Sequence, residues 1–202
     1  MKLYDLGAGS NPRRVRIYLA EKGIEVPMQQ VDMMKGENNA PDYLKINALG
    51  KMPALVLDDG TILTESMAIC RYFEELNPEP PMFGRNALEK AQVEMWNRRA
   101  ELEVAIPTAQ CFQNTHEFWQ GRLEQIPAWG EACREKVNER LKLFDEHMAG
   151  REFLATGDYT VADITLQSGI LLGKAVGIRV PEELKNLSAW WERVTSRPTA
   201  RA

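Results

Sequence analysis

The chain has 202 residues, with 25 Lys plus Arg against 29 Asp plus Glu, and its formal net charge of −4 gives no bulk attraction to nucleic acid or an acidic membrane. No apolar stretch approaches the roughly 18 residues that a membrane span needs, and the start MKLYDLGAG lacks the long apolar segment of a signal peptide. Three cysteines without a CxxC pair are expected to be buried structural thiols, and two histidines are too few for a histidine-rich metal site. We therefore expect a cytoplasmic protein without a bound metal.

Residues 1–76 alternate between strand and helix patterns, which predicts a small mixed sheet with helices on its faces. The first helix takes Ser10 or Asn11 as its N-cap and ends at Gly23. In chain order we predict a strand over 2–6, this first helix, a strand over 25–31, a short helix over 42–47, a hairpin of 53–57 and 61–64, and a helix over 65–76.

The most informative run is 50–57, followed closely by Glu65 and Ser66. A proline that opens an apolar strand cannot donate a ladder hydrogen bond, and an X-Pro bond at a turn is where a cis peptide costs little. A cis Met52-Pro53 bond would turn the Met52 backbone N–H and C=O outward, free to pair with an extended peptide. Glu65 and Ser66 fall where a helix begins, so backbone N–H groups there can receive a carboxylate. The same residues also fit a purely structural turn with an ordinary N-capping pair.

The proline-rich stretch that follows residue 77 predicts a linker, and the pattern beyond it is helical throughout. Pro107 should kink a long helix and free a backbone carbonyl. Thr160 and Asp163 have the spacing of a capping box, opening a helix apolar nearly all round that should lie at the centre of its domain. The predicted parts are a domain at 1–77, a linker at 78–86 and an all-helical domain at 87–202.

Three features, in this order and spacing, resemble the cytosolic glutathione transferase family. They are the Met52-Pro53 turn, the Glu65-Ser66 pair that begins the third helix, and the capping box before a buried helix. The resemblance covers essentially the whole chain, and segments 32–37 and 47–53 look most like theta-like and bacterial members. It implies an N-terminal thioredoxin-like domain with a mixed four-stranded sheet, followed by an all-helical C-terminal domain. It also implies an enzyme that conjugates glutathione, a co-substrate rather than a bound cofactor, to small hydrophobic electrophiles.

Glutathione is a nucleophile only as its thiolate, so the family's chemistry needs a donor near the sulfur. Ser10 lies where the serine of theta-like relatives sits, and Asn11 is the rival, because a carboxamide N–H can donate to sulfur as well. Tyr4 is a third possibility, but its place within the strand favours a core role. Relatives that form a mixed disulfide carry a cysteine where this chain has Ser10, which argues against that chemistry.

The resemblance also assigns residues to the rest of the tripeptide. Glu65 would pair with the α-amine, and Ser66 would meet the γ-glutamyl carboxylate. Met52 would pair through its backbone with the cysteinyl unit, and Lys51 would lie near the glycyl carboxylate, although a solvated surface lysine is the alternative. Asn38 stands where relatives often have histidine, so its contact departs from the family pattern. We expect Lys35, Arg13 and Arg14 to be surface charges rather than ligands.

The remaining expectations concern the acceptor and the assembly. Candidates to line the electrophile pocket are Ala8, Ile106, Gln110, Phe112 and Gln113, with packing in the helical core as the alternative. The family habit implies a homodimer, with Met67, Arg71 and Trp96 as contacts. Two other functions stay open: a glutathione-dependent disulfide or peroxide reductase that works through two glutathione molecules or Asn11, and a non-catalytic binding or scaffold protein.

Overall fold

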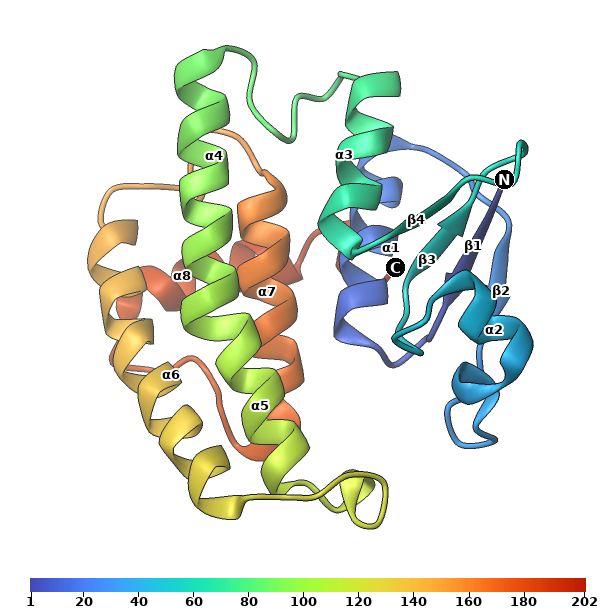
Figure 1. Cartoon of the computed structure of the whole chain (residues 1–202). Helices are drawn as coiled ribbons and strands as arrows, with labels where there is room; N and C mark the ends of the chain where they lie inside the picture. Colours follow the sequence, from blue (N-terminus) through green and yellow to red (C-terminus); the bar gives the residue numbers. More distant parts are fainter. The chain divides into compact units, whose positions relative to one another are not determined.

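The computed structural model describes all 202 residues and divides them into two compact units (Figure 1). The N-terminal unit consists of residues 1–80 together with 201–202, and the C-terminal unit consists of residues 81–200. The division falls inside the stretch 78–86 for which the sequence predicts a linker. None of the helices combines the length and the apolar character that crossing a membrane requires.

The N-terminal unit contains the mixed four-stranded sheet that was predicted. Its strands run in the order β2-β1-β3-β4, with β1 parallel to β2 and antiparallel to β3, and β3 antiparallel to β4. The elements are β1 (Lys2–Asp5), α1 (Ser10–Lys22), β2 (Met28–Gln30), the 3₁₀ turn η1 (Glu37–Asn39), α2 (Pro41–Ile46), β3 (Ala54–Val56), β4 (Ile62–Thr64) and α3 (Ser66–Leu76).

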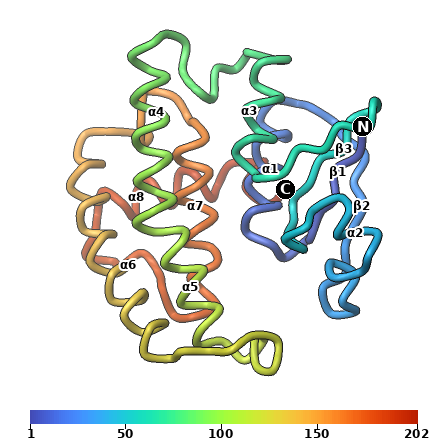
Figure 2. The backbone as a smooth tube through the Cα atoms, viewed as in Figure 1, coloured from blue at the N-terminus to red at the C-terminus, as the bar shows by residue number.

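Helices α1 and α3 pack against each other on one face of this sheet, and α2 lies on the other face (Figures 1 and 2). Val15, Tyr18 and Leu19 form a buried apolar stripe on α1. The predicted stop at Gly23 is confirmed, since Gly23 adopts a left-handed conformation with φ of 65°. The core of the unit therefore lies between the sheet and these two helices.

The start of α1 differs from the prediction, because the N-cap is Gly9 rather than Ser10 or Asn11. The Gly9 carbonyl accepts the hydrogen bond from the Arg13 N–H at 3.0 Å. A Cβ atom at Gly9 would lie 2.9 Å from ring carbons of Pro12, so only glycine fits there. Ser10 and Asn11 consequently lie within the first turn, and neither side chain caps the helix.

The C-terminal unit is all-helical, as predicted. Its elements are α4 (Ala87–Ala100), the π-helical turn η2 (Glu101–Ala105), α5 (Ile106–Thr115), η3 (Glu117–Trp119), α6 (Pro127–Met148), α7 (Val161–Gly173), η4 (Lys174–Val176), α8 (Lys185–Thr195) and η5 (Pro198–Arg201), whose last residue belongs to the N-terminal unit. Helix α7 is buried on nearly every side and lies at the centre of the unit, where it contacts α4, α5 and α8.

The backbone departs from a regular α-helix near Pro107. The widened π turn η2 ends at Ala105, two residues before Pro107, which has no N–H to donate to the helical ladder. The predicted kink and freed carbonyl stay predictions. The capping box of α7 is present, and the Thr160 N–H donates to an Asp163 carboxylate oxygen at 3.0 Å. The other Asp163 oxygen accepts from the Leu154 N–H at 2.8 Å and from the Trp190 ring N–H at 2.9 Å. Asp163 thereby ties the start of α7 to α8.

Candidate functional site

The register of the sheet brings three predicted segments to one end of the N-terminal unit. Ala54 pairs with Thr64 and with Tyr4. Because both pairings are antiparallel, Met52 precedes Ala54 at the end of the sheet where β4 leads into Ser66. The chain leaving β1 toward α1 emerges at that same end. The turn before β3, the start of α3 and the start of α1 therefore lie at the same end of the sheet.

The loop between β1 and α1 is fixed by a polar network around Asp5. The buried Asp5 carboxylate accepts from Arg16 Nη1 and from Gln30 Nε2, both at 2.6 Å. Arg16 also donates to the Gly7 carbonyl at 2.8 Å, and the Gly7 N–H donates to Gln30 Oε1 at 2.9 Å. This network holds the backbone that presents Ser10.

The first turn of α1 presents both candidate donors to the thiolate. Ser10 is half-buried and its hydroxyl makes no hydrogen bond within the chain, whereas Asn11 is exposed and its Oδ1 accepts from Arg14 Nη1 at 3.2 Å. The first backbone N–H groups of a helix have no partner inside the helix, and the helix dipole favours an anion there. The geometry allows either side chain to assist this helix start, so the choice between them stays a prediction.

The Met52-Pro53 bond is cis, as predicted from the sequence. The Met52 side chain is buried against Val31 and Tyr43, and no backbone hydrogen bond within the chain engages the Met52 N–H or C=O. Its main chain therefore has the donor and the acceptor that an extended peptide would need for antiparallel pairing.

The backbone of Lys51, the residue before Met52, is fixed by hydrogen bonds, whereas its side chain is exposed. The Lys51 carbonyl accepts from the Tyr43 hydroxyl at 2.8 Å and from Asn47 Nδ2 at 2.7 Å, while the ammonium group is exposed and makes no contact. Burial raises the pKa of the Tyr43 phenol to about 12, with a smaller contribution from Tyr4, so this hydroxyl stays a donor at neutral pH. Lys51 is positioned to offer a cation near the turn.

Asn38 is buried, and both hydrogens of its amide are engaged. Its Nδ2 donates to the Gly50 carbonyl at 3.1 Å and to Asn39 Oδ1 at 3.2 Å. Gly50 has φ of 59°, and a Cβ atom there would lie 3.0 Å from the Asn38 carbonyl oxygen. Asn38 therefore braces the turn that leads to Lys51, and its predicted contact with glutathione stays a prediction.

Glu65 is the one non-glycine residue with a positive φ, at 67°, and it forms the N-cap of α3. Its ψ of 119° lies outside the left-handed helical region that other residues visit. Side chains rarely adopt such a conformation, and residues held in it cluster at functional sites. Glu65 is exposed and no hydrogen bond or ion pair within the chain engages its carboxylate, so it can receive a cation from outside.

Ser66 follows as the first residue of α3 and contacts an arginine of α1. Ser66 is 5% exposed and Arg14 is 4% exposed, and Arg14 Nη1 donates to Ser66 Oγ at 3.1 Å. The expectation that Arg14 is a surface charge is therefore wrong, whereas Lys35 is exposed as expected. The sequence did hold a signal, because Arg14 lies four residues before Tyr18 and adjoins Val15 on the buried face of α1.

The three cysteines are free and buried, as expected. Cys70 lies one turn after Ser66 on α3, and burial raises the pKa of its thiol to about 12. A thiol with that pKa is protonated at neutral pH and is a poor nucleophile. The buried Cys70 is therefore a poor candidate for a nucleophile at this end of the sheet.

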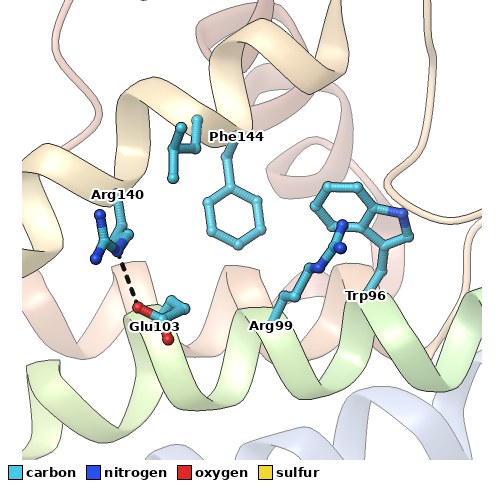
Figure 3. A pocket seen from close by; sticks show the side chains of 6 residues that line it. Trp96, Arg99, Glu103, Arg140 and Phe144 are labelled. Carbon is cyan, nitrogen blue, oxygen red and sulfur yellow. Dashed lines mark hydrogen bonds and ion pairs between the residues drawn. The ribbon is translucent and has the colours of Figure 1, made fainter.

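The C-terminal unit has a hollow of its own, between α4, η2 and α6, with a cavity volume of about 460 Å³. Figure 3 shows Arg140 reaching toward Glu103, and the two pair at 2.9 Å. Arg99 lies over the Trp96 ring, 4.6 Å from its centroid. The hydrogen bond from Arg140, joined by that from Lys136, lowers the pKa of Glu103. The lining consists of Trp96, Arg99, Glu103, Arg140, Leu143 and Phe144, and it includes none of the predicted glutathione or electrophile residues.

The predicted electrophile residues belong to different units. Ala8 is exposed in the loop before α1, and Ile106, Gln110, Phe112 and Gln113 lie on α5. Gln110 Oε1 accepts from the Cys133 thiol at 3.4 Å. The role of all five in a pocket stays a prediction.

Two family descriptions match this chain. Residues 9–76 match "Glutathione S-transferase, N-terminal domain", and residues 128–198 match "Glutathione S-transferase, C-terminal domain". Glutathione S-transferase 2 of Saccharomyces cerevisiae is 36% identical over 205 residues, which cover 100% of this chain and 88% of that protein. The chain belongs to the glutathione S-transferase family.

Solved structures of family members agree with this placement. The crystal structure of Gtt2 from Saccharomyces cerevisiae superposes with a TM-score of 0.94 at 36% identity, covering 100% of this chain and 99% of that one. A glutathione S-transferase domain-containing protein from Marinobacter aquaeolei VT8 gives a TM-score of 0.93 at 34% identity, covering 99% and 100%. The N-terminal glutathione S-transferase match, residues 9–76, contains every candidate residue from Ser10 to Ser66.

Proposed function

We propose that this protein is a glutathione transferase that binds glutathione where the turn before β3 and the starts of α1 and α3 meet. It activates glutathione as the thiolate and transfers its sulfur to small hydrophobic electrophiles. The observation that carries the proposal is the register that puts the unpaired Met52 backbone and the Glu65-Ser66 helix start at one end of the β3–β4 hairpin. An extended tripeptide with a charged γ-glutamyl end matches that arrangement. The kinship to theta-like members is part of the proposal.

The tripeptide is bound by complementary charge at each end and by main-chain pairing in the middle. The exposed Glu65 carboxylate receives the α-amine, and the Ser66 hydroxyl and the N–H groups at the start of α3 receive the γ-glutamyl carboxylate. The cysteinyl unit pairs with Met52, and the glycyl carboxylate lies near the Lys51 ammonium group. Asn38 supports this by holding Gly50.

Activation of the thiol needs more than the helix start alone. A free thiol has a pKa of about 8.5, and each unit of lowering requires ~1.4 kcal/mol of extra stabilisation of the thiolate. A helix N-terminus supplies ~0.3–1 kcal/mol at an exposed position, which is less than one unit. A hydrogen bond to a charged acceptor contributes ~1.5–3 kcal/mol, so a side-chain donor is the larger effect. Ser10 and Asn11 are the two candidates for that donor.

The chemical step follows from a thiolate held beside an acceptor. The thiol gives its proton to water, and a sulfur lone pair forms a new S–C bond. In a displacement the leaving group departs with its bonding electrons, and in a conjugate addition the resulting carbanion takes a proton from water. Holding both reactants in place can lower the barrier by ~7–11 kcal/mol. Ala8, Ile106, Gln110, Phe112 and Gln113 are proposed to line the acceptor's pocket.

The assembly is part of the same proposal. A homodimer would use helices α3 and α4, with contacts from Met67, Arg71 and Trp96. Sedimentation of the full chain at micromolar concentration gives the test, since a single species with the mass of one chain would contradict it.

The function itself is tested in three assays on the purified full chain. We expect retention on immobilised glutathione, turnover of an aryl halide with glutathione, and a thiolate absorbance of bound glutathione at neutral pH. A protein that flows through the column and turns over nothing would be a scaffold. Turnover of a disulfide or peroxide without turnover of the halide would favour the reductase.

A further inference from the structure

We infer that Arg14 is a positioning residue that fixes the direction of two hydrogen-bond donors at the glutathione site, the Ser66 hydroxyl and the Asn11 amide. The inference rests on the proposed function, because it concerns the same ligand. One guanidinium nitrogen, Arg14 Nη1, donates to Asn11 Oδ1 at 3.2 Å and to Ser66 Oγ at 3.1 Å. It thus connects the start of α1 with the start of α3.

The bond to Ser66 decides what the serine hydroxyl can do. A hydroxyl has one hydrogen to donate and two lone pairs to accept with, whereas a guanidinium can only donate. The Ser66 oxygen must therefore be the acceptor toward Arg14, and its hydrogen points to another partner. Ser66 is 5% exposed and its hydrogen has no acceptor within the chain. A carboxylate arriving at the start of α3 supplies that acceptor, so Arg14 prepares the hydroxyl as a donor.

The bond to Asn11 decides which end of the amide faces outward. A carboxamide has an accepting oxygen and a donating NH₂ group. Because Arg14 can only donate, the oxygen turns toward Arg14 and the NH₂ group turns away from it. Asn11 is exposed at the first turn of α1. Arg14 therefore orients the group that can donate to a thiolate, which favours Asn11 over Ser10 for that task.

The surroundings explain why arginine, rather than lysine, suits this position. Arg14 is 4% exposed, and its hydrogen bonds to Asn11 and Ser66 place the guanidinium between α1 and the first turn of α3. Two acceptors on different helices are reached together by a planar, rigid group with several N–H bonds in fixed directions. The lysine ammonium is a compact point charge on a flexible stem, and it holds such directions less well.

The test compares wild-type protein, Arg14→Lys, Ser66→Ala and the double variant. The readouts are the KM for glutathione, the kcat with an aryl halide, and the apparent pKa of the bound thiol from the pH dependence of its thiolate absorbance. We expect Arg14→Lys to raise KM about tenfold and to raise the apparent pKa of the bound thiol. The KM effects of Arg14→Lys and Ser66→Ala should be strongly non-additive, since one acts through the other. Arg13→Lys, the adjacent arginine that contacts neither acceptor, serves as the matched control and should match wild type.

Arg14→Gln is the second variant in case Arg14→Lys does not fold, and circular dichroism with a thermal midpoint checks each protein. The shorter glutamine side chain cannot reach both acceptors, so the same changes in KM and pKa are expected. If the wild-type protein is active and a folded Arg14 variant has an unchanged KM and an unchanged apparent pKa of the bound thiol, the positioning role is wrong. The proposed function is then unaffected. Additive effects of Arg14→Lys and Ser66→Ala also overturn it. A wild-type protein that fails to bind glutathione overturns both this inference and the proposed function.

Discussion

The Tyr43 hydroxyl donates a 2.8 Å hydrogen bond to the Lys51 carbonyl, so helix α2 holds the backbone of the residue directly before Met52. Tyr43→Phe removes this bond and keeps the ring packing, while Asn47 Nδ2 still donates to the same carbonyl. We expect a loss of ~1 kcal/mol in the free energy of unfolding and a rise of roughly fivefold or less in the KM for glutathione. Urea denaturation and steady-state kinetics measure the two effects. Tyr72→Phe, which removes a hydroxyl from α3, is the control, and an unchanged KM in Tyr43→Phe would show that the bond serves stability alone.

Lys51→Met tests the Lys51 ammonium group without changing the hydrogen bonds that its backbone carbonyl accepts. The ammonium group is exposed and makes no contact within the chain, so the free energy of unfolding should change by less than ~0.5 kcal/mol. The KM for glutathione should rise several-fold at low ionic strength, and the difference from wild type should shrink as salt screens the attraction. Lys45→Met, at another exposed lysine of the same unit, should leave KM unchanged. Equal effects of the two substitutions would indicate a general charge effect rather than a carboxylate contact.

The backbone of Glu65 allows a substitution that separates binding from stability. With φ of 67° and ψ of 119°, Glu65 holds a conformation that glycine adopts without cost. Glu65→Gly should therefore leave the free energy of unfolding unchanged or raise it by ~1 kcal/mol. Glutathione binding should weaken strongly, because the carboxylate that meets the α-amine is gone, and calorimetric titration measures that. A destabilised Glu65→Gly protein would show that the side chain has a structural role.

The sequence predicted the features that depend on residues close together in the chain. The proline at the start of β3, the hairpin that it opens, the Glu65-Ser66 pair and the capping box of α7 each have a local signature, and each element is present in the structure. The helical second half followed from the residue pattern and the four-stranded mixed sheet from the resemblance, and both are confirmed, whereas the strand order β2-β1-β3-β4 was not predicted.

The sequence failed where the outcome depends on packing between distant segments. Arg14 is buried because α3, more than fifty residues away, supplies Ser66 as an acceptor. Asn38 donates to the Gly50 carbonyl, which lies beyond α2 in the chain, so its amide is engaged in a way that its place in the family pattern does not show. One local detail was also wrong, because the N-cap of α1 is Gly9, where the Pro12 ring three residues later leaves no room for a Cβ atom.

The hollow in the C-terminal unit gives a pH prediction. Arg140 and Lys136 lower the pKa of Glu103, so the ionised carboxylate stabilises the fold. A depressed pKa contributes stability above the unfolded value of about 4.3, and that contribution is lost as pH falls through the lower, folded value. Because Glu103 is partly exposed, we expect Glu103→Gln to cost less than ~1 kcal/mol at pH 7. Urea midpoints measured from pH 7 downward should converge for the two proteins, whereas a constant difference would exclude this charge effect.

A crystal structure of the full chain with glutathione tests the central claim most directly. We predict an extended tripeptide whose cysteinyl backbone pairs with Met52 and whose γ-glutamyl end contacts Glu65 and Ser66, with its sulfur within hydrogen-bond reach of the first turn of α1. Glutathione bound elsewhere, or bound beside Met52 with its γ-glutamyl end away from α3, would contradict the account.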